Sequence, residues 1–235
     1  MKNKNILVVV AHPDDEYLGC GGSILLWRKN NCRVNVLYVS EGVSARSDNL
    51  DRDKNWVPEI IRREEMAKSY AKVSGINIVG FMRKPNLRMN NLSMLDLVQE
   101  ITQHIDNVKP DIIFTHFPGD LNSDHRVCFE AVLTACRPFT MISIEGLFVF
   151  EVPSSTNWSS SLFLPSFSPN YYTDISNLID KKIDHLVNYD FEMRQFPHPR
   201  SPENIVSLSR IRGSEIGVKN AEAFMVVKYL EMDLD

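Results

Sequence analysis

Short apolar runs that alternate with helix-length segments constrain this chain more than any other feature of its sequence. The runs are rich in Val, Ile, Leu and Phe, which is typical of strands buried on both faces. Segments with helical spacing of apolar residues separate them through the first two-thirds of the chain. This order predicts an α/β fold with a doubly wound, mostly parallel sheet and helices on both faces. A single domain over residues 1–235 is the simplest organisation.

The boundaries of the elements follow from the same pattern and from caps and glycines. The expected strands are 5–11, 33–40, 76–81, 111–116, 143–152 and 223–231. The expected helices are 20–30 (with a Gly-rich start), 58–74, 93–108 (with a Ser cap), 123–136, 175–190 and 201–216. Residues 153–171 are rich in Ser, Pro and aromatic side chains, and we expect them to form a long surface loop.

Composition restricts the class of partner. With 26 Lys and Arg against 30 Asp and Glu, the formal net charge is −4, so we expect no nucleic-acid partner. The apolar runs are strand-sized, so no transmembrane segment is expected, and the N-terminal run lacks the cleavage site of a signal peptide. The cysteines form no C-x-x-C pair, which favours reduced thiols in a cytoplasmic protein over a thiolate metal site. They are Cys20, Cys32, Cys128 and Cys136.

Two polar stretches follow the first and the fourth expected strand: AHPDDE at 11–16 and THFPGDLNSDHR at 115–126. In a doubly wound sheet of order 3-2-1-4-5, these two strands are neighbours. The loops that leave their carboxyl ends flank the crevice where ligands bind. The sequence therefore predicts that the two stretches face each other.

The residue types in these stretches predict a metal site. A tight turn after Pro13 can direct both His12 and Asp15 at one ion, while Asp14 projects differently and stays available as a base. His125 is the candidate third ligand. Two imidazoles and one carboxylate leave a coordination position open for water, as in catalytic zinc sites, and Fe²⁺ or Mn²⁺ would also accept this set. A cation would also offset the repulsion among the adjacent carboxylates.

The neighbours of these residues have more than one interpretation. Asp120 and Asn122 either shape the turn or contribute to the site. Asp124 can orient a metal ligand, whereas His116 is expected to be a packed histidine rather than a ligand. Glu16 has two possible roles: it either contacts the metal ligands from behind or forms a salt bridge with an arginine.

The motifs AHPDDE and GDLNSDHR, in this order, resemble those of the PIG-L/LmbE-like family of metal-dependent N-deacetylases. The resemblance extends through RREE at 62–65 and FPHPRS at 196–201 to GVKNAEAF at 217–224. It implies a Rossmann-like fold and the removal of an N-acetyl group from an N-acetylglucosamine-type amino sugar or its conjugate, with release of acetate. The partner it implies is a small acetylated amino sugar whose aglycone is left open.

The resemblance also implies roles for residues. His12, Asp15 and His125 look like the zinc ligands of the family, and Asp14 looks like its general base. His198 falls where related enzymes have a histidine that polarises the substrate carbonyl. In some relatives that histidine reaches a neighbouring subunit, so we expect a homo-oligomer.

One family variant, H-P-D-H, has a further histidine where this chain has Asn122, so His198 is the better candidate for its role. Arg46, Arg63 and Asp120 are candidates for polar contacts with substrate hydroxyls. Each of these three can equally well occupy the surface or a turn.

Two other classes of function compete with the hydrolase. A dinucleotide-binding oxidoreductase is suggested by LGCGGS at 18–23 and by Glu41 at the end of the second strand, but G-x-G-x-x-G is not matched. Three carboxylates would also repel the pyrophosphate. A non-catalytic metal- or sugar-binding module would have a structural metal, yet structural zinc sites are usually closed by four protein ligands. Here three ligands and a spare carboxylate are present.

Overall fold

A computed structural model of the chain describes residues 1–45, 55–138, 144–187 and 193–231. Its strands are β1 (Asn5–Val10), β2 (Arg33–Ser40), β3 (Asn77–Lys84), β4 (Ile112–His116), β5 (Gly146–Phe150), β6 (Tyr171–Asp174) and β7 (Ala221–Tyr229). Its helices are α1 (Asp15–Lys29), α2 (Val57–Ser74), α3 (Met94–Val108), α4 (Ser123–Ala135), α5 (Ile179–Val187) and α6 (Pro202–Ser214), with a 3₁₀ turn, η1 (Met89–Asn91). None of the helices in these ranges is long and apolar enough to cross a membrane.

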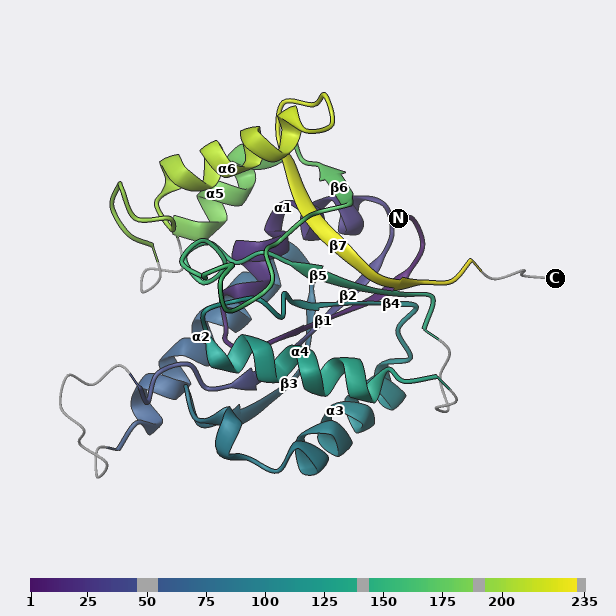
Figure 1. Cartoon of the computed structure of the whole chain (residues 1–235), viewed down its shortest axis with the longest axis vertical. Coiled ribbons are helices and arrows are strands. Elements are labelled where there is room, and N and C mark those ends of the chain that lie inside the picture. The colour runs from purple at the N-terminus through teal and green to yellow at the C-terminus, as the bar shows by residue number, and fades with distance from the viewer. Residues whose placement is uncertain (46–54, 139–143, 188–192, 232–235) are drawn as a thin grey trace.

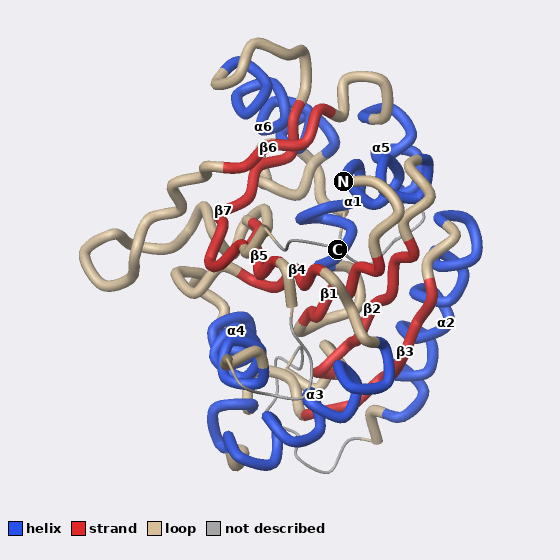
Figure 2. Tube along the Cα trace, turned by 90° about the vertical axis from the view of Figure 1, so that its right-hand side faces the viewer, coloured by secondary structure: helices blue, strands red, loops and turns tan. Residues whose placement is uncertain are grey.

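One sheet contains these strands in the order β3-β2-β1-β4-β5-β7-β6. Strands β3, β2, β1, β4 and β5 run parallel, in the order that the sequence predicts. Because successive side chains of a strand point to opposite faces, Val8 and Val10 pack under α1, α2, α5 and α6, whereas Leu7 and Val9 pack under α3 and α4. Figures 1 and 2 show the sheet between these two groups of helices, which confirms the doubly wound α/β prediction.

The far edge of the sheet differs from the expectation. Strand β7 is antiparallel to both β5 and β6. Strand β6 is missing from the sequence prediction, which placed Tyr171 at the end of the loop 153–171 and left residues 172–174 unassigned. Four residues are too few for a period-two pattern to be recognised, and pairing with a strand about fifty residues later decides the conformation.

Helix α1 begins at Asp15, five residues before the predicted start at Cys20, and the predicted segment 20–30 corresponds to the remainder of the helix. The helix is kinked at Cys20, where φ is −138°. Glycine is unfavourable inside a helix, so the glycines around Cys20 predict a helix start there. Gly19 is needed for packing, since a Cβ there would lie 2.2 Å from Cδ2 of Phe150. Because α1 begins at Asp15, both Asp15 and Glu16 lie in its first turn, where the helix dipole favours carboxylates.

Helices α2, α3, α4 and α6 begin and end within two residues of their predicted bounds, whereas α5 begins at Ile179 instead of the predicted 175. The side chain of Ser93 accepts the N–H of Asp96 at 3.3 Å, which confirms the predicted cap of α3. The predicted end of the 175–190 helix and the first residue of the 143–152 strand fall outside the described residues.

Two buried charged side chains satisfy the backbone groups that the kink in α1 leaves without helical partners. Glu222 accepts the N–H of Gly22 at 2.8 Å and that of Ser23 at 2.6 Å. Lys182 donates to the carbonyl of Leu18 at 2.9 Å and to Glu222 at 2.7 Å. The Lys182–Glu222 pair therefore caps both halves of the broken helix.

We expect Glu222→Ala to lower the free energy of unfolding by about 3–5 kcal/mol, because it leaves a buried ammonium without its partner. Glu65→Ala is the matched control, since its partner Lys68 is 50% exposed, and it should cost less than about 1 kcal/mol. Urea denaturation followed by circular dichroism measures both values. Equally small losses in the two variants would contradict the capping role.

Candidate active site

Three buried side chains bring potential metal-ligand atoms together at the carboxyl edge of the sheet. His12 follows β1, Asp15 lies in the first turn of α1, and His125 lies in the first turn of α4. One ligand atom from each lies within 4.8 Å of the other two. Oδ2 of Asp15 is 3.1 Å from Nδ1 of His12 and 3.3 Å from Nε2 of His125. The two polar stretches of the sequence therefore face each other.

The donor set of this cluster fits a divalent cation. Within the described part of the chain, Oδ1 of Asp15 and Nε2 of His125 are buried without a hydrogen-bond partner. Buried polar atoms normally have a partner, and a cation between these side chains would supply one. Zinc, iron and manganese all accept two imidazoles and a carboxylate.

A carboxylate lies behind each of the two histidines. Oδ2 of Asp124 is 3.2 Å from Nε2 of His12. Oδ2 of Asp120 is 2.8 Å from Nδ1 of His125, and its other oxygen accepts the hydroxyl of Thr156 at 2.5 Å. Such contacts fix the orientation of a ligand ring and increase its basicity. Asp120, a candidate for a substrate contact in the sequence, therefore lies behind a histidine instead.

These contacts shift the pKa values of the metal-free cluster. Burial opposes the charge on the histidines, but Asp15 and the carboxylates behind them outweigh it, which raises the pKa of His12 and raises that of His125 to about 10. Burial also opposes ionisation of Asp15, but His125 and His12 outweigh it and keep the pKa of Asp15 well below its usual value. A metal ion therefore has to displace protons from this cluster.

His116 lies beside the cluster and packs as the sequence predicts. It forms a second group of potential ligand atoms with Asp120 and His125. However, its Nε2 accepts the N–H of Ala11 at 2.8 Å, and its ring stacks on that of His125 at 3.8 Å. Burial, and then the neighbouring His125, keep the pKa of His116 well below its usual value.

An open cavity of about 200 Å³ adjoins the cluster. Its lining includes His12 and Asp15 of the cluster. Other lining residues are Asp14, Arg63, Asn86, Leu87, Asn122 and Arg200. Asn122 also caps α4 by accepting the N–H of Asp124 at 2.9 Å, so it combines the two roles that the sequence left open. Arg46, a further candidate, falls outside the described residues.

Asp14 lies between two arginines at the wall of this cavity. Its Oδ1 is 3.1 Å from Arg63, and its Oδ2 is 3.5 Å from Arg200. Gly42, with φ +73°, allows Arg63 to approach, because a Cβ there would lie 3.0 Å from Nε of the arginine. Two guanidinium groups stabilise the negative charge of a carboxylate and restrict its orientation.

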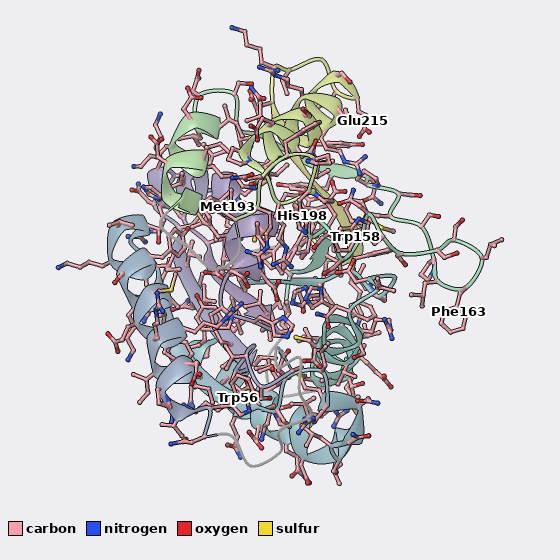
Figure 3. All side chains as sticks on the ribbon, turned by 90° about the vertical axis from the view of Figure 1, so that its left-hand side faces the viewer. Trp56, Trp158, Phe163, Met193, His198 and Glu215 are labelled. Atoms are coloured by element: carbon pink, nitrogen blue, oxygen red, sulfur yellow. The ribbon has the colours of Figure 1, made fainter. Side chains whose placement is uncertain are left out.

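The contact between Asp14 and Arg200 is not visible in local sequence, although Arg200 belongs to the quoted FPHPRS motif. His198, two residues earlier, is not among the residues that line the cavity. Its Nδ1 accepts the N–H of Arg200 at 3.0 Å, and Trp158 packs edge-on against its ring (Figure 3). Because Nδ1 accepts a hydrogen bond, the proton of the neutral His198 ring is on Nε2.

Glu16, which the sequence left without a defined role, is completely buried behind Asp14. It accepts the hydroxyl of Tyr38 at 2.8 Å and the N–H of Asp14 at 3.1 Å. Burial is the main cause that raises its pKa to about 8. Glu16 therefore supports the backbone of Asp14 at the start of α1.

A family model described as PIG-L, GlcNAc-PI de-N-acetylase, matches residues 7–136, which is more than half of the chain. The chain belongs to the PIG-L family. Among its relatives, a probable N-acetyl-α-D-glucosaminyl L-malate deacetylase of Bacillus subtilis is 30% identical over 137 residues. That match covers 56% of this chain and 60% of the relative.

Solved structures confirm the fold of this PIG-L family member. An N,N'-diacetylchitobiose deacetylase from Pyrococcus horikoshii superimposes with a TM-score of 0.76 at 17% identity, covering 95% of this chain and 84% of that one. A 4-carboxy-2-hydroxymuconate hydratase from Pseudomonas putida superimposes with a TM-score of 0.73 at 19% identity, covering 100% of both chains. Because deacetylases and a hydratase share the fold, the reaction has to be argued from the site.

We expect the affinity of the cluster for zinc to increase with pH up to about pH 10. The pKa of His12 is raised and that of His125 is raised to about 10, and both must lose their protons before they bind a metal. Competition with a chromophoric chelator measures the affinity, and calorimetry in two buffers counts the protons released. Asp120→Asn should weaken zinc binding by about 10–100-fold and release fewer protons. An affinity that does not change with pH would contradict the assignment of the two histidines.

Proposed function

We propose that this chain is a zinc-dependent amide hydrolase that removes the N-acetyl group from an N-acetylglucosamine-type amino sugar or its conjugate and releases acetate. Residues 1–235 act as one domain in this proposal. The observation that carries it is the position of Asp14, which shares one cavity with the potential ligands His12 and Asp15. Membership of the PIG-L family and the deacetylases among the relatives support the reaction class.

His12, Asp15 and His125 would hold the metal, and Asp120 and Asp124 would orient the two histidines. A bound divalent cation supplies Lewis-acid chemistry, which lowers the pKa of water and polarises an acyl oxygen. Fe²⁺ or Mn²⁺ could fill the same site, and measurement of the metal content of the purified protein distinguishes the three ions.

Asp14 is the proposed general base. It takes a proton from the water whose oxygen attacks the acyl carbon, and it returns this proton to the nitrogen as the C–N bond breaks. The products are acetate and the free amine. Arg63 and Arg200 keep the carboxylate of Asp14 in a fixed orientation during both transfers.

His198 is the proposed donor to the acyl oxygen, because its Nε2 carries the proton. The cavity lining contains Arg200 but not His198, so movement of residues 196–201 or a neighbouring subunit would bring the imidazole to the substrate. A homo-oligomer therefore remains part of the proposal, and light scattering after size-exclusion chromatography tests it.

Two rival functions have different signatures. For a dinucleotide-binding oxidoreductase, the N-terminus of α1 would have to accept a pyrophosphate, but Asp15 and Glu16 occupy its first turn. A non-catalytic module would bind zinc or an amino sugar without releasing acetate.

The four cysteines are all free thiols, which supports a proposed cytoplasmic location.

We expect the zinc-loaded protein to release acetate from N-acetylglucosamine derivatives. Asp14→Asn should reduce kcat by about 10²–10⁴-fold, because it removes the proton acceptor, and should keep the bound zinc. His125→Ala should lose the zinc itself. An acetate assay, together with metal analysis of each variant, measures both effects, and full activity of Asp14→Asn would exclude this base.

A panel of acetylated sugar conjugates then identifies the aglycone. Conjugates that carry a lipid, a nucleotide, a thiol precursor or a second sugar cover the alternatives. The preferred conjugate should differ from the others mainly in kcat/KM.

A further inference from the structure

Leu87 combines a left-handed backbone conformation with an apolar side chain at the cavity, whereas the other lining residues with positive φ are Asp14 and Gly42. Its φ of +54° lies in the left-handed region, which a leucine rarely adopts. Its side chain is 48% exposed and lines the cavity. A half-exposed leucine contributes little to a core, so stability does not explain why a leucine occupies a strained position at a site.

Two buried carboxylates fix the backbone at this position. Asp124 accepts the N–H of Leu87 at 2.7 Å. Glu41, at the end of β2, accepts the N–H of Asn86 at 2.8 Å and that of Val43 at 2.6 Å. The backbone of residues 86–87 is therefore attached both to α4 and to the loop after β2, and Leu87 has a defined position.

The same carboxylate connects Leu87 with the candidate metal ligands. Oδ2 of Asp124, which accepts the N–H of Leu87, also lies 3.2 Å from Nε2 of His12. The same oxygen atom of Asp124 therefore contacts both the backbone N–H of Leu87 and the ring of His12. Among the described residues that line the cavity, Leu87 has the largest apolar side chain, and the others are mostly polar or charged.

We propose that Leu87 limits the size of the acyl group that the enzyme removes. This inference rests on the proposed function, in which the acyl carbon lies between Asp14 and the metal ligands. The alkyl part of the acyl group is then the apolar part of the substrate nearest to the metal, and Leu87 is the large apolar side chain on that side. The leucine accepts the methyl of an acetyl group and excludes longer chains.

The test compares N-acetyl-, N-propionyl- and N-butyrylglucosamine as substrates of the zinc-loaded enzyme, with the free amine as the measured product. We expect Leu87→Ala to raise the propionyl-to-acetyl ratio of kcat/KM by at least about tenfold, since one methylene in an apolar pocket changes selectivity by about 10–200-fold. Leu87→Gly should shift the ratio in the same direction. Glycine adopts the left-handed backbone without strain, so this variant separates loss of the side chain from a change of the backbone.

Leu121→Ala is the matched control. Leu121 is 52% exposed, lies within the second polar stretch and does not line the cavity, so its removal should leave the ratio unchanged. Turnover with an unchanged ratio in both Leu87 variants overturns the role of Leu87 alone. No amine from any of the three sugars in the wild-type enzyme overturns the proposed function on these substrates, and this inference with it.

Discussion

The buried carboxylate of Asp15 is the group on which the rest of the site depends. An ionised carboxylate is costly to bury unless positive groups surround it. The first turn of α1 supplies a partial positive charge, and His12 and His125 supply imidazoles at 3.1 and 3.3 Å. These requirements fix where α1 begins, where α4 begins and which strand ends lie side by side. Without a metal, protons on the histidines supply this positive charge, because the pKa of His12 is raised and that of His125 is raised to about 10. A bound cation would replace these protons.

The C-terminal part of the chain supports this arrangement, although the family model matches only residues 7–136. Lys182 and Glu222 complete the hydrogen bonds of α1 at its kink, and therefore fix the helix whose first turn carries Asp15. Arg200 contacts Asp14 from the loop before α6. Residues 7–136 thus contain the candidate ligands and the base, and the C-terminal part of the chain helps to fix their positions.

The sequence was sufficient for the central sheet and for the meeting of the two polar stretches, because both follow from strand order and from the position of ligands in doubly wound sheets. It was not sufficient where contacts over a long distance decide the conformation. Strand β6 forms by pairing with β7, and the kink in α1 is capped by residues more than 160 positions away. Leu87 was not predicted because its conformation depends on Glu41 and Asp124.

The fold is shared with a hydratase, so the chemistry of the base has to distinguish the two reactions. A hydratase adds water to a double bond and keeps all the atoms of its substrate, whereas an amide hydrolase must expel an amine, which leaves only after it gains a proton. One carboxylate can first accept the proton of water and then deliver it to nitrogen if it stays in place between the two transfers. Asp14, fixed by Arg63 and Arg200 and by the contact of its N–H with Glu16, meets that requirement. The fixed carboxylate therefore suits the two proton transfers of amide hydrolysis, and the family match and the deacetylase relatives, rather than the fold, favour this reaction over hydration.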